Sequence, residues 1–307
     1  MVESDFEKDK ENTPGEVLYA DYKNVKIFEK HKNNLPNLKI YLSDFWRRKV
    51  FSLELARFSD KAEYLGSKLG KSWLVLNPLL LALVYFLLVL VIRGGGTKEA
   101  GLETLAKILI GLFTFYFAQN CINDGAQSIT SGGKLILNQS FPLTLLPLSS
   151  MIKSLWQYIP TIPVYFIVIF IGRLFIPDAN IILLSKSLIA TPYVLICLFI
   201  ISFGLSLIFA TINVYFRDTG KLLTYITRIW LYATPVLWSS DILKGWHKLI
   251  VDLNPLGSVI SSVTSIWVDG KLPTSENLLA MSLWAVFLLI IGGYIFISRE
   301  RDFAVRL

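Results

Sequence analysis

The sequence has 307 residues, of which 53% are hydrophobic and 17% are charged. A soluble domain usually carries about 25% charged residues, so the composition argues against a large soluble core. Residues 1–72 are polar and rich in charge, whereas long uncharged runs begin at Trp73. Hydropathy distributed in this way predicts membrane spans. The formal net charge of +7 fits cytoplasmic loops that face anionic membrane lipid, and we expect no nucleic-acid partner.

The chain begins with residues 1–41, a polar segment that we expect to be a weakly ordered cytoplasmic tail. From residue 42 to residue 57, apolar side chains recur on one helical face, at Leu42, Phe45, Trp46, Val50 and Leu53. This pattern predicts an amphipathic helix in the plane of the membrane surface, within an interface region of residues 42–72. An ordinary soluble helix is the alternative. Asp60, with Glu63 three residues later, indicates the start of a second helix.

Six apolar runs are long enough to cross a membrane, because each crossing needs about 20 apolar residues. They are residues 73–92, 104–123, 145–175 (long enough to be tilted or broken), 188–212, 222–240 and 278–298. With the N-terminus inside, the inner flanks carry about twice as many basic residues as the outer loops. The sequence therefore predicts an all-α polytopic membrane protein with six spans and an N-in/C-in orientation. The transmembrane domain covers residues 73–298, and residues 299–307 form a cytoplasmic C-terminal tail.

The outer loop before the last span has a helical pattern of its own. Apolar residues repeat at helical spacing over residues 242–253 and again over residues 256–267, and Asn254-Pro255 separates the two runs. Proline disfavours a continuous helix, so residues 241–270 are predicted to form a hairpin of two short helices. Neither helix reaches spanning length, and we expect the hairpin to lie at the outer interface or to cap a pathway.

Motifs for catalysis and for cofactor binding are missing. No GxxxxGK[ST] motif occurs, so the chain lacks the usual loop that holds nucleotide phosphates. His31 and His247 are the two histidines, which leaves little for histidine catalysis or metal binding. Acidic residues that could couple transport to protons or sodium are limited to span ends, at Glu103 and Asp124. We expect no catalytic residue, no metal and no cofactor bound by this chain, and secondary transport is poorly supported.

Arg228 and the aromatic residues indicate a pathway for a substrate. Arg228 lies seven residues after Lys221, on the order of 10 Å along the fifth run. It can contact an anionic group such as a lipid-carrier phosphate, or it can snorkel or pair with Asp218. Aromatic faces stack on sugar rings, although packing in the core or against lipid is the alternative. The predicted substrate path comprises Arg228, Phe113, Tyr116, Trp156, Tyr165, Tyr225, Tyr232 and Trp238.

Several strings occur in an order that resembles the ABC-2 type permeases of the polysaccharide and polyol-phosphate exporter family. The strings are LGKSWLVLNPL at residues 69–79, IGLF at 110–113, KLI at 134–136, FP at 141–142, LP at 146–147, VYFRD at 214–218, TPV at 234–236 and NPL at 254–256. The similarity covers roughly residues 42–307. This family includes the export permeases for O-antigen, teichoic acid and galactan.

The resemblance implies a homodimer joined to two nucleotide-binding ATPase subunits, which supply ATP and Mg²⁺ chemistry from another chain. It implies that the surface helix (42–57), the loop after span two (132–141) and the loop after span four (215–221) contact the ATPase. The coupling residues would be Arg47, Arg48, Lys134, Phe141, Phe216, Arg217 and Asp218. The hairpin would hold the gate residues Trp246, Leu249, Asn254, Pro255 and Trp267.

The expected function is that of a permease subunit that is not an enzyme by itself. It would move a polysaccharide linked to a prenyl diphosphate, of O-antigen or galactan type, or a teichoic acid, across the bacterial cytoplasmic membrane. Two alternatives stay open: an ABC-2 permease for small lipids or drugs, and a membrane glycosyltransferase or polymerase. The second alternative should place an acidic pair in the cavity, and the sequence offers none that we recognise.

Overall fold

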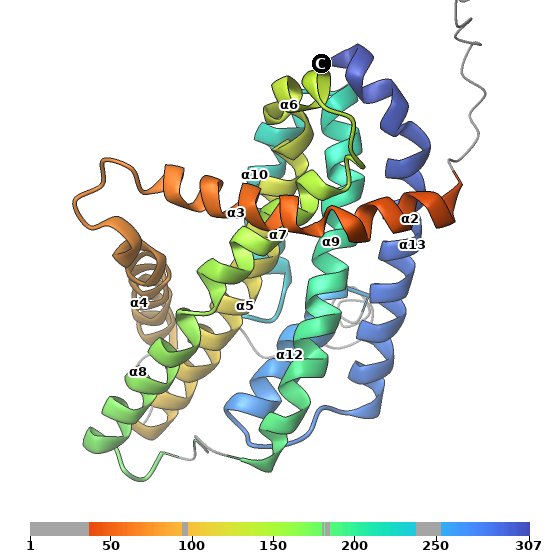
Figure 1. Ribbon diagram of the computed structural model, residues 1–307. Coiled ribbons are helices and arrows are strands. Elements are labelled where there is room, and N and C mark those ends of the chain that lie inside the picture. The colour runs from red at the N-terminus through yellow and green to blue at the C-terminus, as the bar shows by residue number, and fades with distance from the viewer. Residues whose placement is uncertain (1–36, 94–97, 180, 182–184, 238–252) are drawn as a thin grey trace, which may run out of the picture. The chain divides into compact units, whose positions relative to one another are not determined.

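The computed structural model describes residues 37–93, 98–179, 181, 185–237 and 253–307, all within the unit Leu35–Leu307. Every regular element in these residues is a helix. The elements are α2 (Leu38–Arg47), α3 (Lys49–Glu63), η1 (Gly70–Ser72), α4 (Trp73–Arg93), α5 (Lys98–Ser131), α6 (Gly133–Asn138), α7 (Leu145–Tyr158), α8 (Thr161–Phe175), η2 (Lys186–Ala190), α9 (Thr191–Tyr215), α10 (Thr219–Ala233), α12 (Pro255–Trp267) and α13 (Ser275–Arg306) (Figure 1).

Four helical stretches in the described residues are long and apolar enough to cross a membrane. They are Ala100–Ser131, Leu145–Phe175, Lys186–Tyr215 and Ser275–Arg306, which contain the second, third, fourth and sixth predicted spans. The third is broken into α7 and α8 at Ile159 and Pro160, because proline has no N–H to donate to the preceding turn. α4 begins at Trp73, the residue at which the first span is predicted to begin.

The fifth predicted span is shorter than the sequence indicates. α10 is helical only from Thr219 to Ala233, whereas the apolar run continues to residue 240. Thr234 is extended, with φ −101° and ψ 141°, and Pro235 follows it. The residue before a proline is biased away from the helical conformation, so the helix prediction is wrong for residues 234–237.

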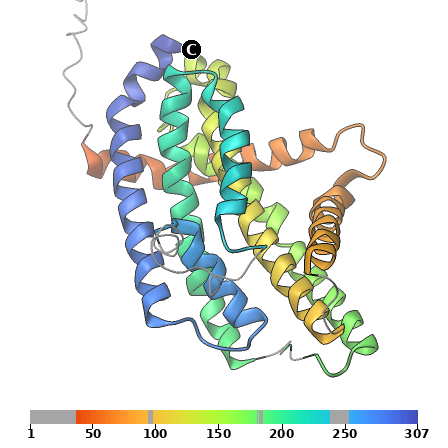
Figure 2. The ribbon, with the colours of Figure 1, turned by 180° about the vertical axis from the view of Figure 1, so that it is seen from behind.

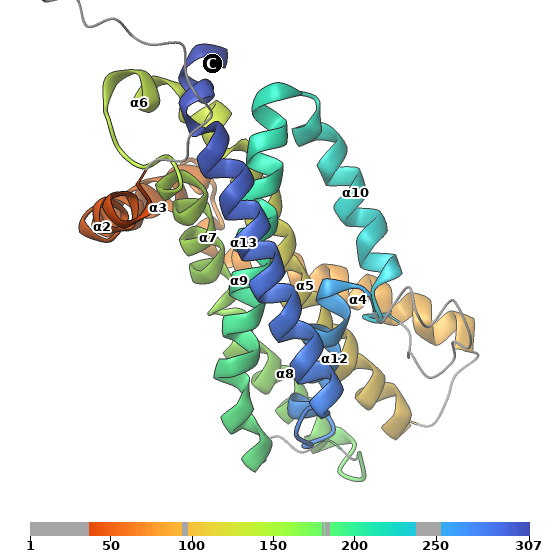
Figure 3. The same cartoon turned by 90° about the vertical axis from the view of Figure 1, so that its right-hand side faces the viewer.

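The core is built around α9, which lies between α5 and α13 (Figures 1 and 3). α9 and α13 approach so closely that the backbones touch where two glycines face each other. A Cβ on Gly204 would lie 2.5 Å from the carbonyl oxygen of Leu288, and one on Gly292 would lie 2.3 Å from the carbonyl oxygen of Gly204. Glycine is therefore required at both positions, because any side chain would push the helices apart.

α2 and α3 cross the bundle between its middle and the end that carries α6 and the C-terminus, and α4 stands apart from α9 and α13 when the unit is seen from behind (Figures 1 and 2). The amphipathic region is thus two helices that meet at Arg48, and not one helix over residues 42–57. The predicted second start at Asp60 is wrong, since Asp60 lies in the last turn of α3. α3 packs against α7 through its small buried residues. Trp46, Val50 and Phe58 stay exposed.

α12 is the second helix of the predicted hairpin, and the structure confirms its extent within one residue. It packs against α5, α9 and α13, and most of its side chains are buried. The first helix of the hairpin, with Trp246 and Leu249, lies outside the described residues, as do Trp238 and most of the N-terminal tail.

Candidate functional site

A cavity of about 210 Å³ lies between the end of α3 and the helices α4, α5, α7 and α8. Its aromatic lining includes Phe113 and Tyr116, two of the residues predicted for the substrate path. The complete lining is Glu63, Tyr64, Trp73, Leu74, Asn77, Phe113, Tyr116, Phe117, Asn120, Ser154, Gln157, Tyr158 and Thr161. The cavity therefore combines aromatic faces with amide, hydroxyl and carboxyl groups.

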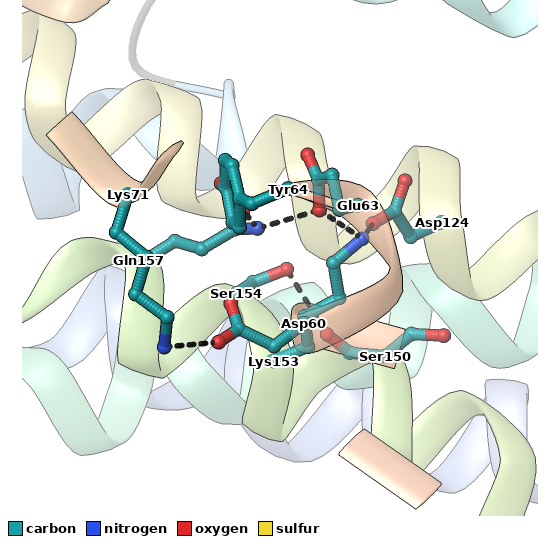
Figure 4. A network of polar contacts seen from close by, with 9 residues as sticks. All are labelled: Asp60, Glu63, Tyr64, Lys71, Asp124, Ser150, Lys153, Ser154 and Gln157. Atoms are coloured by element: carbon teal, nitrogen blue, oxygen red, sulfur yellow. Dashed lines mark hydrogen bonds and ion pairs between the residues drawn. The ribbon is translucent and has the colours of Figure 1, made fainter. Parts of the chain in front are cut away.

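Beside the cavity, Lys153 joins three helices through ion pairs (Figure 4). Its Nζ lies 2.8 Å from Glu63 Oε2 on α3 and 3.0 Å from Asp124 Oδ2 on α5, while Lys153 itself belongs to α7. The Lys153 side chain is only 16% exposed. Lys153 is not among the site residues that the sequence pattern predicts. The available signal was a lysine well inside the predicted span 145–175, whereas the other cation of this run, Arg173, lies at its end. Asp124 follows the neighbouring predicted span directly.

The same network continues toward α4. Asp60 Oδ2 accepts a hydrogen bond from Lys71 Nζ at 2.6 Å, and Gln157 Nε2 donates to Glu63 Oε2 at 3.0 Å. Burial, followed by the carboxylates of Glu63 and Asp60, raises the pKa of Tyr64 to about 12. The Tyr64 phenol thus stays neutral at physiological pH and contributes an aromatic face and a hydroxyl.

A second group of predicted path residues lies on the exposed face of α10. Arg228 lies over the ring of Tyr225, with 6.0 Å from its guanidinium carbon to the ring centroid. One turn further, the hydroxyl of Tyr232 lies 3.3 Å from that of Tyr85 on α4. Among the described residues Arg228 forms no ion pair, so the alternative of a pair with Asp218 is not observed. Tyr225 and Tyr232 are more than half exposed.

Two further aromatic candidates, Trp156 and Tyr165, do not line the cavity. Trp156 is half-buried on α7. Tyr165 on α8 is fully buried, and its hydroxyl donates to the carbonyl oxygen of Trp267 at 3.1 Å. The Trp267 indole in turn donates to Thr191 Oγ1 at 3.2 Å. Tyr165 and Trp267 therefore fix the end of α12 against α8 and α9.

Asn254 connects α10 to the start of α12. Its Oδ1 accepts from Trp230 Nε1 at 2.9 Å and from the Leu256 N–H at 3.0 Å, and its Nδ2 donates to Thr234 Oγ1 at 2.8 Å. Asn254 is the N-cap of α12 and Pro255 is its first residue, which is the preferred place for both residue types. A movement of α10 would therefore reach α12 through this side chain.

Two of the predicted coupling residues, Arg48 and Phe141, lie where α2–α3 contact the loop between α6 and α7. α6 itself lies at the same end of the unit as the C-terminus (Figure 1). Arg48 Nη1 donates to the carbonyl oxygen of Ser140 at 2.5 Å, and Phe51 packs on Phe141 with ring centroids 5.0 Å apart. Glu300, on α13, accepts from the Leu143 N–H at 2.5 Å. The loop before α7 is thus held from both α2–α3 and α13.

The loop after α9 is held by the C-terminal residues. Arg217 Nη2 donates to the carbonyl oxygens of Arg306 and Leu307 at 3.3 and 3.4 Å, and the Arg306 guanidinium lies 4.3 Å from the Tyr215 ring centroid. The other predicted coupling residues, Arg47, Lys134, Phe216 and Asp218, are exposed. The sequence pattern did not indicate that residues at the end of α13 contact the predicted coupling loops.

These helices define a multi-pass membrane protein of the all-α type, with an aromatic cavity beside an ion-pair network around the largely buried Lys153. The chain belongs to the ABC-2 type transporter family, whose sequence profile matches residues 55–268.

Curated relatives give a narrower comparison. The O-antigen export system permease protein RfbA of Myxococcus xanthus is 29% identical over 256 residues, which is 82% of this chain and 93% of that protein. A permease of the same name from Klebsiella pneumoniae is 28% identical over 249 residues, which is 80% of this chain and 90% of that protein.

Proposed function

We propose that this chain is the permease subunit of an ATP-driven exporter that moves a prenyl-diphosphate-linked polysaccharide across the bacterial cytoplasmic membrane. The observation that carries the proposal is the similarity to O-antigen export permeases over about four-fifths of the chain. It agrees with the match to the ABC-2 type transporter family. The cargo is a polymer of O-antigen or galactan type, or a teichoic acid.

The proposed topology has six spans and both termini in the cytoplasm. α4 and α10 serve as the first and fifth spans, beside the four stretches that meet the length and hydropathy criteria. α2 and α3 lie in the inner membrane surface, which agrees with the exposed side chains of Trp46, Val50 and Phe58. Residues 1–37 and 299–307 form the cytoplasmic tails, the first of them shorter than the predicted 1–41 because α2 begins at Leu38. Residues 241–270 form the outer gate hairpin.

Energy enters from two ATPase subunits that bind ATP and Mg²⁺, and this permease binds neither. The docking surface comprises Arg47 and Arg48, the loop with Phe141, and the loop from Phe216 to Asp218, with Lys134 beside them. The hydrogen bonds from Arg48 and Glu300 to the loop before α7 support this assignment, because they let a force on the loop reach both α2 and α13.

The polymer moves along the face where two copies of the permease meet. The exposed face of α10 supports this assignment, since Arg228, Tyr225 and Tyr232 are exposed on it and face the proposed second copy. Arg228 binds the diphosphate of the carrier, and the tyrosines stack on sugar rings. Movement of α10 is transmitted to the gate helix α12 through Asn254.

Deletion of the gene in its host tests this function. Surface polysaccharide should fall to background, and lipid-linked polymer should accumulate on the inner leaflet, because synthesis continues without export. A plasmid-borne wild-type gene should restore the surface polymer. Inactivating the nucleotide site of the partner ATPase should give the same phenotype. Unchanged surface polysaccharide with a gain of drug sensitivity would assign the chain to small-molecule export instead.

A further inference from the structure

The cavity between α3, α4, α5, α7 and α8 sits beside an unbalanced negative charge. Glu63 and Asp124 share the single cation Lys153, and Asp60 pairs with Lys71. Three carboxylates thus face two lysines. Among the described residues that line the cavity, none is a lysine or an arginine. An unpaired charge is costly at the edge of a membrane, so the site favours a cation and disfavours an anion such as a diphosphate.

The walls of the cavity are suited to an ammonium group. Tyr64, Trp73 and Tyr116 contribute aromatic rings, whose faces attract cations. The side-chain amides of Asn77 and Asn120 form no hydrogen bond to another described residue. Their carbonyl oxygens are therefore available as acceptors, and a primary ammonium brings three donors.

We propose that this cavity binds the ammonium headgroup of an aminophospholipid, of the phosphatidylethanolamine type. The end of α3 and the first turns of α4 line the cavity, at the depth where the proposed topology puts the headgroups of the inner leaflet. The inference rests on that placement. The ammonium lies between the Glu63 carboxylate and the aromatic rings, and the acyl chains extend along α4. The lipid thereby ties the surface helix to the first span.

Native mass spectrometry of the purified full chain tests the site. The protein is reconstituted with equal amounts of phosphatidylethanolamine and phosphatidylglycerol, and retained lipids are then counted. The wild-type chain should retain phosphatidylethanolamine over phosphatidylglycerol by about threefold, since a partly exposed cation–π contact and ion pair have that order of effect. Phosphatidylcholine, which has no N–H donor, should be retained less. Equal retention of phosphatidylcholine would overturn the role of the donors.

Glu63→Gln provides the decisive variant, because it leaves Asp124 and Lys153 as a balanced pair. The preference for phosphatidylethanolamine should fall to about one. Glu54→Gln is the matched control: Glu54 also lies on α3 and pairs with Arg57, but it does not line the cavity, so the preference should be unchanged. If Glu63→Gln does not fold, Trp73→Leu, at a 41% exposed position, should lower the preference in the same way.

Two outcomes would overturn the assignment. One is a preference in Glu63→Gln equal to that of the wild type. The other is displacement of the retained lipid by excess free ethanolamine, which would assign the cavity to a soluble amine. The measurement needs neither ATPase nor polysaccharide. A chain that shows the lipid preference but fails to restore surface polymer would therefore contradict the proposed function and leave the lipid site standing.

Discussion

Gly292→Ala should destabilise the protein by about 2 kcal/mol, which is the net of two opposing effects. Alanine gains about 1 kcal/mol in helix propensity over glycine. Its Cβ, however, would lie 2.3 Å from the carbonyl oxygen of Gly204, and overpacking against a backbone costs about 3 kcal/mol. The apparent melting temperature in detergent, followed by fluorescence-detected size exclusion, should fall by roughly 4–8 °C.

Gly293→Ala is the control for this prediction, since it lies one residue further along α13. A Cβ at Gly293 meets nothing within 4 Å, so the variant keeps the propensity gain without the clash. Its melting temperature should equal or exceed that of the wild type. A fall of the same size in both variants would show that the α9–α13 contact is not the cause.

Lys153→Met should be the second strongly destabilising change. It leaves Glu63 and Asp124 without a cation between helices α3, α5 and α7. Breaking a buried pair costs about 3–5 kcal/mol. The two carboxylates are 44% and 40% exposed, and partial solvation reduces the expected loss to about 2 kcal/mol. The melting temperature should again fall by several degrees, and proteolysis in the α3–α4 connection should become faster.

Lys107→Met is the matched comparison, because Lys107 pairs with Asp269 at 3.4 Å and both side chains are well exposed. An exposed pair contributes about 0–1 kcal/mol, so this variant should behave like the wild type. Adding Glu63→Gln and Asp124→Asn to Lys153→Met should recover part of the lost stability, since no charge is then left unpaired. Equal melting temperatures for Lys153→Met and Lys107→Met would show that the ion pairs of Lys153 do not stabilise the packing of α3, α5 and α7.

The elements that the sequence predicted well are those in which one run of residues carries the whole signal. The start of α4 at Trp73 and the start of α12 at Asn254-Pro255 follow from local chemistry, namely an apolar run and a cap followed by proline. α10 was predicted too long, because hydropathy continues through Thr234-Pro235 while the backbone leaves the helix there. No glycine or proline lies near Arg48, where α2 and α3 meet. The sequence therefore gives no local signal for a break at this point.

The candidate site was predicted only in part, for a physical reason. Phe113 and Tyr116 were predicted as path residues from their aromatic side chains alone, and both line the cavity. The partners of Lys153 come from helices that are distant in sequence, so their pairing is decided by how α3, α5 and α7 pack. The role of Glu300 depends in the same way on the position of the end of α13. The predicted substrate and coupling roles remain predictions.

Co-purification with the ATPase subunits encoded nearby tests the central claim most directly. The permease and each candidate ATPase are purified together, and ATP hydrolysis is measured with and without lipid-linked polysaccharide. A stable complex whose ATP turnover rises with the lipid-linked polymer is the result expected of an export permease. A permease that binds none of these ATPases, or that hydrolyses ATP when purified alone, would contradict the claim that its energy comes from a partner chain.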